Sequence, residues 1–209
     1  MSQTLTLYTN PMSRGQIARW MLEEVGAPYE TVLLDYGTTM KAPDYLAINP
    51  MGKVPAIVHD GRVVTECAAI CAYLADAFPA ANLAPPPADC HAYYRWLFFA
   101  AGPVESAVTN RALGFVLPEG RDRTAGYGTF DATMDALESA IATGPWICGD
   151  QFTAADVYVG AQIDWGLTFQ SIPSRPAFER YAARLRTRPA YQRQKATDSA
   201  LIAAMQKQG

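Results

Sequence analysis

The pair Asp60-Gly61 constrains the fold of this chain more than any other short stretch. It lies between two short apolar runs, at about residues 56–58 and 62–64, and Asp-Gly in that setting is typical of the tight turn of a β-hairpin. A run with the character of a helix follows over about residues 66–78. The sequence therefore predicts an antiparallel pair of strands followed by a helix.

Two more strands are predicted before the hairpin. Residues 4–8 alternate apolar and polar side chains, and residues 29–34 are again strand-like. The stretch 13–25 between them carries apolar side chains at helical spacing, so we expect a strand–helix–strand unit with parallel strands. One short helix is expected over residues 42–50. Together with the hairpin, these elements predict a mixed four-stranded sheet.

The character of the chain changes after the helix that follows the hairpin. A segment rich in Pro and Ala interrupts all periodicity, and everything after it is helical in character. We therefore expect an α/β domain over residues 1–79, a linker over residues 80–88 and an all-helical domain over residues 89–209. The helices expected in the second domain cover about residues 89–115, 121–143, 153–169, 175–187 and 189–196.

Composition and charge argue against several classes of function. Half of the residues are hydrophobic, and the formal net charge is -3 with no basic block, so no nucleic-acid partner is expected. No apolar run approaches the ~20 residues that span a bilayer, and the N-terminus lacks a secretory signal, so we expect no membrane association and a cytoplasmic location. The four cysteines contain no CxxC pair and there are only two histidines, so no metal site is expected.

Val54-Pro55, at the start of the third expected strand, has two interpretations. Proline cannot donate to a sheet ladder, so one interpretation is a trans proline that simply begins a strand. The other is a cis proline, which would turn the N–H and C=O groups of Val54 outward to pair with an extended peptide. The dipeptide alone does not decide between them.

The stretch TECAAI, residues 65–70, lies at a junction between a strand and a helix. Thr65 or Glu66 can act there as an ordinary helix cap. The same helix end can instead bind a ligand, because free N–H groups at Cys67 and Ala68 suit a carboxylate and the Glu66 side chain suits an ammonium group. Together these groups would bind an amino-acid zwitterion.

The stretch TAAD, from Thr153 to Asp156, has the pattern of a helix capping box in the helical part of the chain. In such a box a hydroxyl and a carboxylate each accept a hydrogen bond from an exposed backbone N–H. We interpret this motif as purely structural. Replacement of Asp156 is therefore expected to impair folding rather than chemistry.

Taken together, these segments resemble the cytosolic glutathione S-transferases of the bacterial type, and the resemblance covers essentially the full chain. NPMGKVPAIVHDGRVVTECAAICAYL, residues 49–74, is similar to the most diagnostic stretch of that family, with its cis proline at Pro55. FTAADVYVG, residues 152–160, is similar to the family's helix-capping motif. The resemblance implies a thioredoxin-like N-terminal domain, a helical C-terminal domain and glutathione as co-substrate, with no metal.

The resemblance also assigns residues to a glutathione site. Glu66 and Cys67 would hold the γ-glutamyl end, and Val54, before the cis proline, would pair through its main chain with the cysteinyl backbone. Lys53 would lie near the glycine carboxylate, and Lys41 is a second candidate for that role. The family usually has Ser at the position of Cys67, so we expect a weakened hydroxyl contact and a modest loss of affinity.

In that family the reactive sulfur belongs to glutathione, so the turn after the first strand needs a group that stabilises a thiolate rather than a cysteine. Ser13, where the helix begins, is the first candidate, and its alternative role is a simple helix cap. Thr9, Asn10 and Tyr8 are the other candidates. A shift of one residue in this poorly alignable loop would put Met12 in the key position.

The leading functional hypothesis is an enzyme that activates glutathione and adds its sulfur to a hydrophobic electrophile, with detoxification as the expected role. By resemblance, one face of the aromatic-rich first helix after the linker lines the electrophile pocket. A homodimer is also expected by resemblance. Two alternatives stay open: a glutathione-dependent disulfide or peroxide reductase, and a non-catalytic binding protein that keeps the fold.

Overall fold

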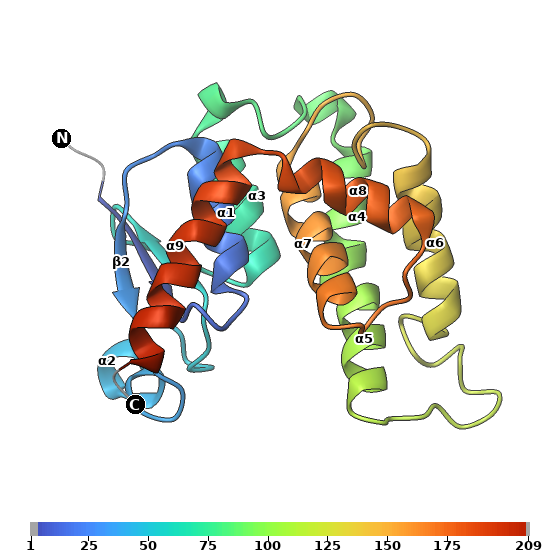
Figure 1. Cartoon of the computed structure of the whole chain (residues 1–209), viewed down its shortest axis with the longest axis horizontal. Coiled ribbons are helices and arrows are strands. Elements are labelled where there is room, and N and C mark those ends of the chain that lie inside the picture. Colours follow the sequence, from blue (N-terminus) through green and yellow to red (C-terminus); the bar gives the residue numbers. More distant parts are fainter. Residues whose placement is uncertain (1–3, 208–209) are drawn as a thin grey trace. The chain divides into compact units, whose positions relative to one another are not determined.

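A small mixed β-sheet forms the centre of the first part of the chain in the computed structural model, which describes residues 4–207 (Figure 1). Its strands are β1 (Leu5–Thr9), β2 (Glu30–Leu33), β3 (Ala56–His59) and β4 (Arg62–Thr65). They follow the order β2-β1-β3-β4. β1 pairs in parallel with β2, whereas β3 pairs antiparallel with both β1 and β4. The expected mixed four-stranded sheet and its hairpin are confirmed.

Four helices and two short 3-10 turns accompany the sheet. They are α1 (Gly15–Val25), α2 (Pro43–Leu46), α3 (Cys67–Ala77), α9 (Pro189–Gln206), η1 (Thr39–Lys41) and η2 (Pro79–Ala81). The α1 helix buries Ile17, Trp20 and Met21, and each such side chain contributes about 1.5–3 kcal/mol when it leaves water. It ends at Gly26, whose left-handed φ of 68° lets its N–H bond the Leu22 carbonyl.

The register of the sheet brings three loop segments to one edge. Tyr8 of β1 pairs with Ala56 of β3, and Ala56 pairs with Thr65 of β4. The residues that follow Tyr8, precede Ala56 and follow Thr65 therefore lie next to one another. These segments are the turn after β1, the Val54-Pro55 pair and Glu66.

The remaining helices form a separate helical part. They are η3 (Pro87–Asp89), α4 (His91–Phe99), α5 (Glu105–Ala112), α6 (Phe130–Ala142), α7 (Ala154–Thr168) and α8 (Pro176–Arg186). One continuous helix was expected over about residues 89–115. The structure instead inserts a π-helical stretch, η4 (Ala100–Val104), between α4 and α5, and Pro103 lies inside it.

The expected helix start near residue 121 is wrong, because α6 begins only at Phe130. The segment before it takes a non-helical course in which Gly114, Gly120 and Gly128 all have positive φ angles. The cap of α6 is Thr129, whose side chain accepts a hydrogen bond from the Ala132 N–H.

The described chain divides into two compact units. The first unit contains the described residues up to Asn82 and those from Thr187 onward, and we call it the sheet unit. The second unit is Leu83–Arg186, and we call it the helical unit. The sequence had assigned everything after the linker to the helical domain. The structure differs, because α9 belongs to the sheet unit.

Contacts between α1 and α9 explain this assignment. The rings of Trp20 and Tyr191 meet edge to face with centroids 5.1 Å apart, and Arg19 Nε lies 2.9 Å from Asp198 Oδ1. In Figure 1 the red α9 helix runs beside the blue α1 helix. It also continues well beyond residue 196, where its end was expected. Periodicity identifies such a helix but not the surface against which it packs.

The capping box that starts α7 is confirmed. The Thr153 side chain and the carboxylate of Asp156 each accept the expected backbone N–H. Asp156 also accepts hydrogen bonds from the Ile147 N–H and the Tyr181 hydroxyl, at 2.8 and 2.6 Å. Burial of this fully enclosed carboxyl raises its pKa in spite of these donors.

Candidate functional site

The Val54-Pro55 peptide bond is cis, which confirms the second interpretation of this dipeptide. Pro55 is buried, and Val54 packs against the core cluster that contains Tyr45 and Ala56. Within residues 4–207, no hydrogen bond occupies the backbone N–H or C=O of Val54. This position just before β3 is therefore open to pair with the backbone of an extended peptide.

The loop before Val54 is held by side chains at its inner side. The Tyr45 hydroxyl and the Asn49 side chain both donate to the Lys53 carbonyl, at 2.6 and 2.7 Å. Lys41 Nζ donates to the carbonyls of Met51 and Gly52, at 3.1 and 2.8 Å. Lys41 therefore fixes the loop as well as carrying a charge beside it.

Of the two lysines assigned to the glycine carboxylate, Lys53 has the less occupied side chain. Lys53 is exposed, and its ammonium group forms no hydrogen bond or ion pair with any other residue between 4 and 207, although its carbonyl accepts from Tyr45 and Asn49. Its ammonium group is available to an anion in solution. The structure thus places Lys53 as the freer cation and Lys41 mainly as a support of the loop.

The first turn of α3 presents the second set of binding groups. The N–H groups of Cys67 and Ala68 have no intrahelical acceptor, as at any helix start, and no other described residue accepts them. The Glu66 carboxylate is exposed and likewise has no partner among residues 4–207. Glu66 has a φ of 64°, a conformation that costs of order 1–3 kcal/mol in a non-glycine residue.

Cys67 is buried and turned away from solvent. Its Sγ lies 3.7 Å from the Arg14 carbonyl at the start of α1, to which it donates. A hydrogen bond with Cys67, together with burial, raises the pKa of the Cys71 thiol one turn further along α3. Cys67 therefore links the first turn of α3 to the turn after β1 through its side chain, and its backbone N–H stays without an acceptor among the described residues.

The turn after β1, residues 10–15, is closed by its own side chains. The Ser13 N–H donates to the Asn10 carbonyl at 3.1 Å, and the Ser13 hydroxyl donates to the same carbonyl at 2.6 Å. Ser13 Oγ in turn accepts the Gly15 N–H at 2.9 Å. Ser13 thus caps the start of α1, and its proton is directed at Asn10 in this structure.

The other candidates in this turn are more deeply engaged. Thr9 is fully buried, and its hydroxyl contacts the Asn10 carbonyl. Asn10 spans to the Leu34 carbonyl with its amide N–H and accepts the Met12 N–H, at 2.8 and 2.9 Å. Tyr8 is partly buried and packs against the core cluster beside Tyr45, with ring centroids 5.7 Å apart. Among the three buried candidates, Ser13 at 8% is more exposed than Asn10 or Thr9, whereas Tyr8 is only partly buried.

Two residues at the start of α1 were not identified from the sequence. Gly15 allows Thr9 and Ser13 to approach, because a Cβ at Gly15 would lie 1.9 Å from Thr9 Oγ1. Gln16 donates its side-chain N–H to the Pro11 carbonyl at 2.6 Å. The only sequence signal for the first is a glycine at a helix start, and none exists for the second.

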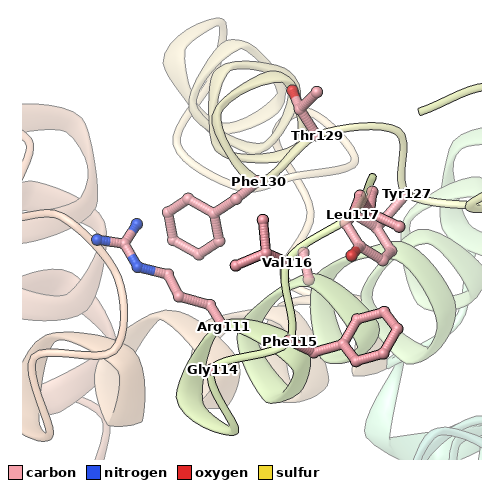
Figure 2. A pocket seen from close by; sticks show the side chains of 9 residues that line it. Arg111, Gly114, Phe115, Val116, Leu117, Tyr127, Thr129 and Phe130 are labelled. Carbon is pink, nitrogen blue, oxygen red and sulfur yellow. The ribbon is translucent and has the colours of Figure 1, made fainter. Parts of the chain in front are cut away.

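The helical unit contains an apolar cavity of about 300 Å³. Figure 2 shows Arg111 extended along the Phe130 ring, and the guanidinium carbon lies 4.1 Å from that ring's centroid. The aromatic-rich helix that was expected to line the electrophile pocket, α4, contributes no residue to this cavity. Its lining residues are Ala107, Arg111, Gly114, Phe115, Val116, Leu117, Tyr127, Thr129 and Phe130.

No helix between residues 4 and 207 combines the length and the apolar character that crossing a membrane requires. In the same part of the chain, no group of three or more His, Cys, Asp or Glu side chains is placed to hold a metal ion.

Two family models match the chain. Residues 3–76 match the model for "Glutathione S-transferase, N-terminal domain", and residues 105–165 match the model for "Glutathione S-transferase, C-terminal domain". The chain is 31% identical to glutathione S-transferase GstB of Escherichia coli K12, over 81% of this chain and 86% of the relative. It is 29% identical to glutathione S-transferase GstA of Escherichia coli O157:H7, over 77% of this chain and 82% of the relative.

Solved structures agree with these matches. A glutathione transferase from Methylococcus capsulatus strain Bath superposes with a TM-score of 0.79 at 29% identity, covering 94% of this chain and 100% of that one. A glutathione transferase homolog from Sulfitobacter, solved with bound glutathione, gives a TM-score of 0.75 at 29% identity, covering 94% and 99%. The expected thioredoxin-like fold followed by a helical domain is confirmed.

Proposed function

Since this chain belongs to the glutathione S-transferase family, we propose that it binds glutathione at the sheet edge, stabilises its thiolate and conjugates glutathione through its sulfur to a hydrophobic electrophile. The observation that carries the proposal is the unpaired backbone of Val54 beside the unpaired first turn of α3. Glutathione is a short peptide with a zwitterionic end, so it needs both kinds of group. Its presence in the Sulfitobacter homolog supports the same choice of ligand.

Each part of glutathione has a partner at this edge. The γ-glutamyl carboxylate accepts the N–H groups of Cys67 and Ala68, and its ammonium group pairs with the Glu66 carboxylate. The cysteinyl backbone pairs with Val54 as an added strand. The glycine carboxylate is bound by Lys53, while Lys41 keeps the loop in place. The sheet register then directs the cysteinyl sulfur toward the turn after β1.

The chemistry requires a thiolate at that turn. A free thiol has a pKa of about 8.5, and a hydrogen bond to the anion lowers it by about 1 to 2. Ser13 supplies this bond when its O–H turns from the Asn10 carbonyl to the sulfur, while its Oγ keeps the bond from Gly15. The thiol proton leaves to solvent. The sulfur lone pair then forms a C–S bond to the electrophile, which releases its leaving group or takes up a proton.

The acceptor side of the proposal rests on the helical unit. Its apolar cavity suits a hydrophobic electrophile, since most of its wall consists of aliphatic and aromatic side chains. A homodimer, a cytoplasmic location and a role in detoxification stay predictions from the family resemblance.

The proposal is tested by titrating the ultraviolet absorbance of the bound thiolate against pH. We expect wild type to hold the glutathione thiol pKa at least ~1 below its free value, and Ser13→Ala to restore that value. Ser199→Ala is the matched control, because Ser199 is an exposed serine on α9 of the same unit. It is expected to behave as wild type.

One observation favours a second candidate, a glutathione-binding protein without catalysis. The Ser13 proton already has an acceptor in the Asn10 carbonyl, and Ser13 Oγ already caps α1. If glutathione binds to wild type and to Ser13→Ala with the same unshifted thiol pKa, Ser13 is only a helix cap and this second candidate replaces the first. If glutathione does not bind at all, both candidates fail.

A further inference from the structure

Gln16 lies in the first turn of α1. Its side-chain amide is hydrogen-bonded at both the nitrogen and the oxygen. Its Nε2 donates to the Pro11 carbonyl at 2.6 Å. Its Oε1 accepts from Lys195 Nζ at 3.2 Å, and Gln194 Nε2 lies 3.5 Å away. Lys195 and Gln194 both lie on α9, more than 170 positions along the chain. The amide of Gln16 therefore connects the C-terminal helix to the turn after β1.

The α9 end of this connection is anchored in the interior. Gln194 Nε2 donates to Asp198 Oδ2 at 2.7 Å, and Arg19 Nε donates to Asp198 Oδ1 at 2.9 Å. Gln194, Asp198 and Arg19 are each at most 2% exposed. A buried charge pair whose oxygens are both bonded resists movement, because breaking it leaves an uncompensated charge. Gln194 is thus held rigidly where it meets Gln16.

The donors on α9 also fix the orientation of the Gln16 amide. An ammonium group and an amide N–H both face its oxygen, so the amide must present its own N–H in the opposite direction. That direction is the Pro11 carbonyl. A flipped amide would place N–H against donors at one end and oxygen against a carbonyl at the other.

Pro11 lies inside the turn that contains Ser13. The turn is closed by the bond from the Ser13 N–H to the Asn10 carbonyl, and that same carbonyl accepts the Ser13 hydroxyl. The position of the Pro11 carbonyl sets the plane of the next peptide, whose Met12 N–H donates to Asn10 Oδ1. A change at Pro11 is therefore transmitted to the acceptor that orients the Ser13 proton.

From these contacts we infer that Gln16 is a positioning residue for the thiolate site, and that α9 acts on glutathione activation through it. This inference rests on the proposed function, because it assumes that the turn stabilises a thiolate. Gln16 touches neither the sulfur nor the electrophile in this scheme. It holds the turn in the shape in which Ser13 reaches the sulfur.

Two substitutions of Gln16 test separately its contact with Lys195 on α9 and its hydrogen bond to the Pro11 carbonyl in the turn. Gln16→Glu keeps an acceptor for Lys195 but loses the donor to Pro11, whereas Gln16→Met loses both without adding a charge. Arg193→Met is the matched control, because it removes another contact between α9 and α1, the ion pair of Arg193 with Glu23 at 2.8 Å, without touching the turn.

Two quantities are measured. One is the pKa of the thiol of bound glutathione, determined from thiolate absorbance, and the other is kcat/KM for the aryl halide 1-chloro-2,4-dinitrobenzene. We expect both Gln16 variants to raise the thiol pKa and to lower kcat/KM about three- to tenfold near neutral pH, mainly through kcat. Arg193→Met is expected to leave both values unchanged. Lys195→Met is expected to shift them in the same direction as Gln16→Met, but less.

The outcomes distinguish this inference from the function on which it rests. If Ser13→Ala raises the thiol pKa but Gln16→Met keeps the wild-type value, the role of Gln16 is overturned and the proposed function stands. If Arg193→Met changes the pKa as much as Gln16→Met, loss of packing explains both, and the inference fails. An unshifted thiol in wild type overturns the inference and the proposed function together.

Discussion

At the scale of single residues, the turn after β1 is packed so closely that it leaves no room for a methyl group at Gly15. A Cβ at Gly15 would lie 1.9 Å from Thr9 Oγ1 and 3.0 Å from Ser13 Oγ. Thr9 is 0% exposed, so its side chain has no free space into which to move. The backbone of the turn would have to shift instead, and Ser13 with it.

We therefore expect Gly15→Ala to lower the free energy of unfolding by about 1–3 kcal/mol, as overpacking of a tight interior does. Gly102→Ala is the control, because a Cβ at Gly102 meets nothing within 4 Å in a helical stretch. It is expected to be neutral or to stabilise by about 0.4–1 kcal/mol. Urea unfolding measures both variants, and equal losses in the two would contradict the packing argument.

Some residues of the candidate site were predicted from the sequence and others were not. Val54, Glu66 and Cys67 were named because their roles use backbone groups and local helix ends, which short motifs describe well. Gly15 and Gln16 were missed, because their contacts depend on Thr9 packing and on a helix near the other end of the chain. Local pattern carries no information on such distant partners.

At the scale of elements, the start of α7 depends on one buried carboxylate. Asp156 accepts hydrogen bonds from Thr153, Ile147 and Tyr181 and is fully buried. Burial, the largest effect, raises its pKa above the ordinary carboxyl value. The folded state therefore takes up a proton at Asp156 at a higher pH than the unfolded state does.

The sign of the pH effect follows from this difference. Between the unfolded and the folded pKa, the folded state binds the extra proton, so stability falls as pH rises through that window. Relative to Asp156→Asn, wild type is expected to gain stability as pH is lowered from neutral toward the ordinary carboxyl range. Urea unfolding of both proteins at several pH values measures the difference. A wild-type advantage that shrinks on acidification would show that the fold favours the ionised form instead.

The element that the sequence placed least well is α9. Its existence was predicted over residues 189–196, but its length and its partner were not. Its contacts with α1 are largely polar, with Arg188 and Arg193 bonded to glutamates at the end of α1 and Asp198 bonded to Arg19. In a sequence, a polar helix face indicates exposure to solvent. The surface against which α9 packs could therefore not be predicted.

At the scale of the whole molecule, the chain forms two units that each bury a core, and the described termini both belong to the sheet unit. All groups assigned to glutathione lie in this unit. The four tryptophans divide unequally between the units: Trp20 lies in the sheet unit, and Trp96, Trp146 and Trp165 lie in the helical unit. Labelled tryptophans therefore report on each unit separately.

This division predicts where glutathione stabilises the molecule. A ligand at 100 times its Kd adds about 2.7 kcal/mol to the unit whose folded form it binds. In protein labelled with 5-fluorotryptophan, we expect the fluorine resonance of native Trp20 to persist to higher urea when glutathione is added. Trp20→Phe identifies that resonance, and the other three resonances report whether the helical unit gains stability as well.

The urea midpoints of the four tryptophan resonances then show which unit gains stability from glutathione. A higher midpoint at Trp20 alone places glutathione in the sheet unit, with the helical unit unfolding independently. A common rise at all four tryptophans means that the units unfold as one cooperative body, so that energy gained at the sheet edge stabilises both. A rise confined to Trp96, Trp146 and Trp165 would contradict a glutathione site built on Val54 and α3, because neither lies in the unit that those residues report.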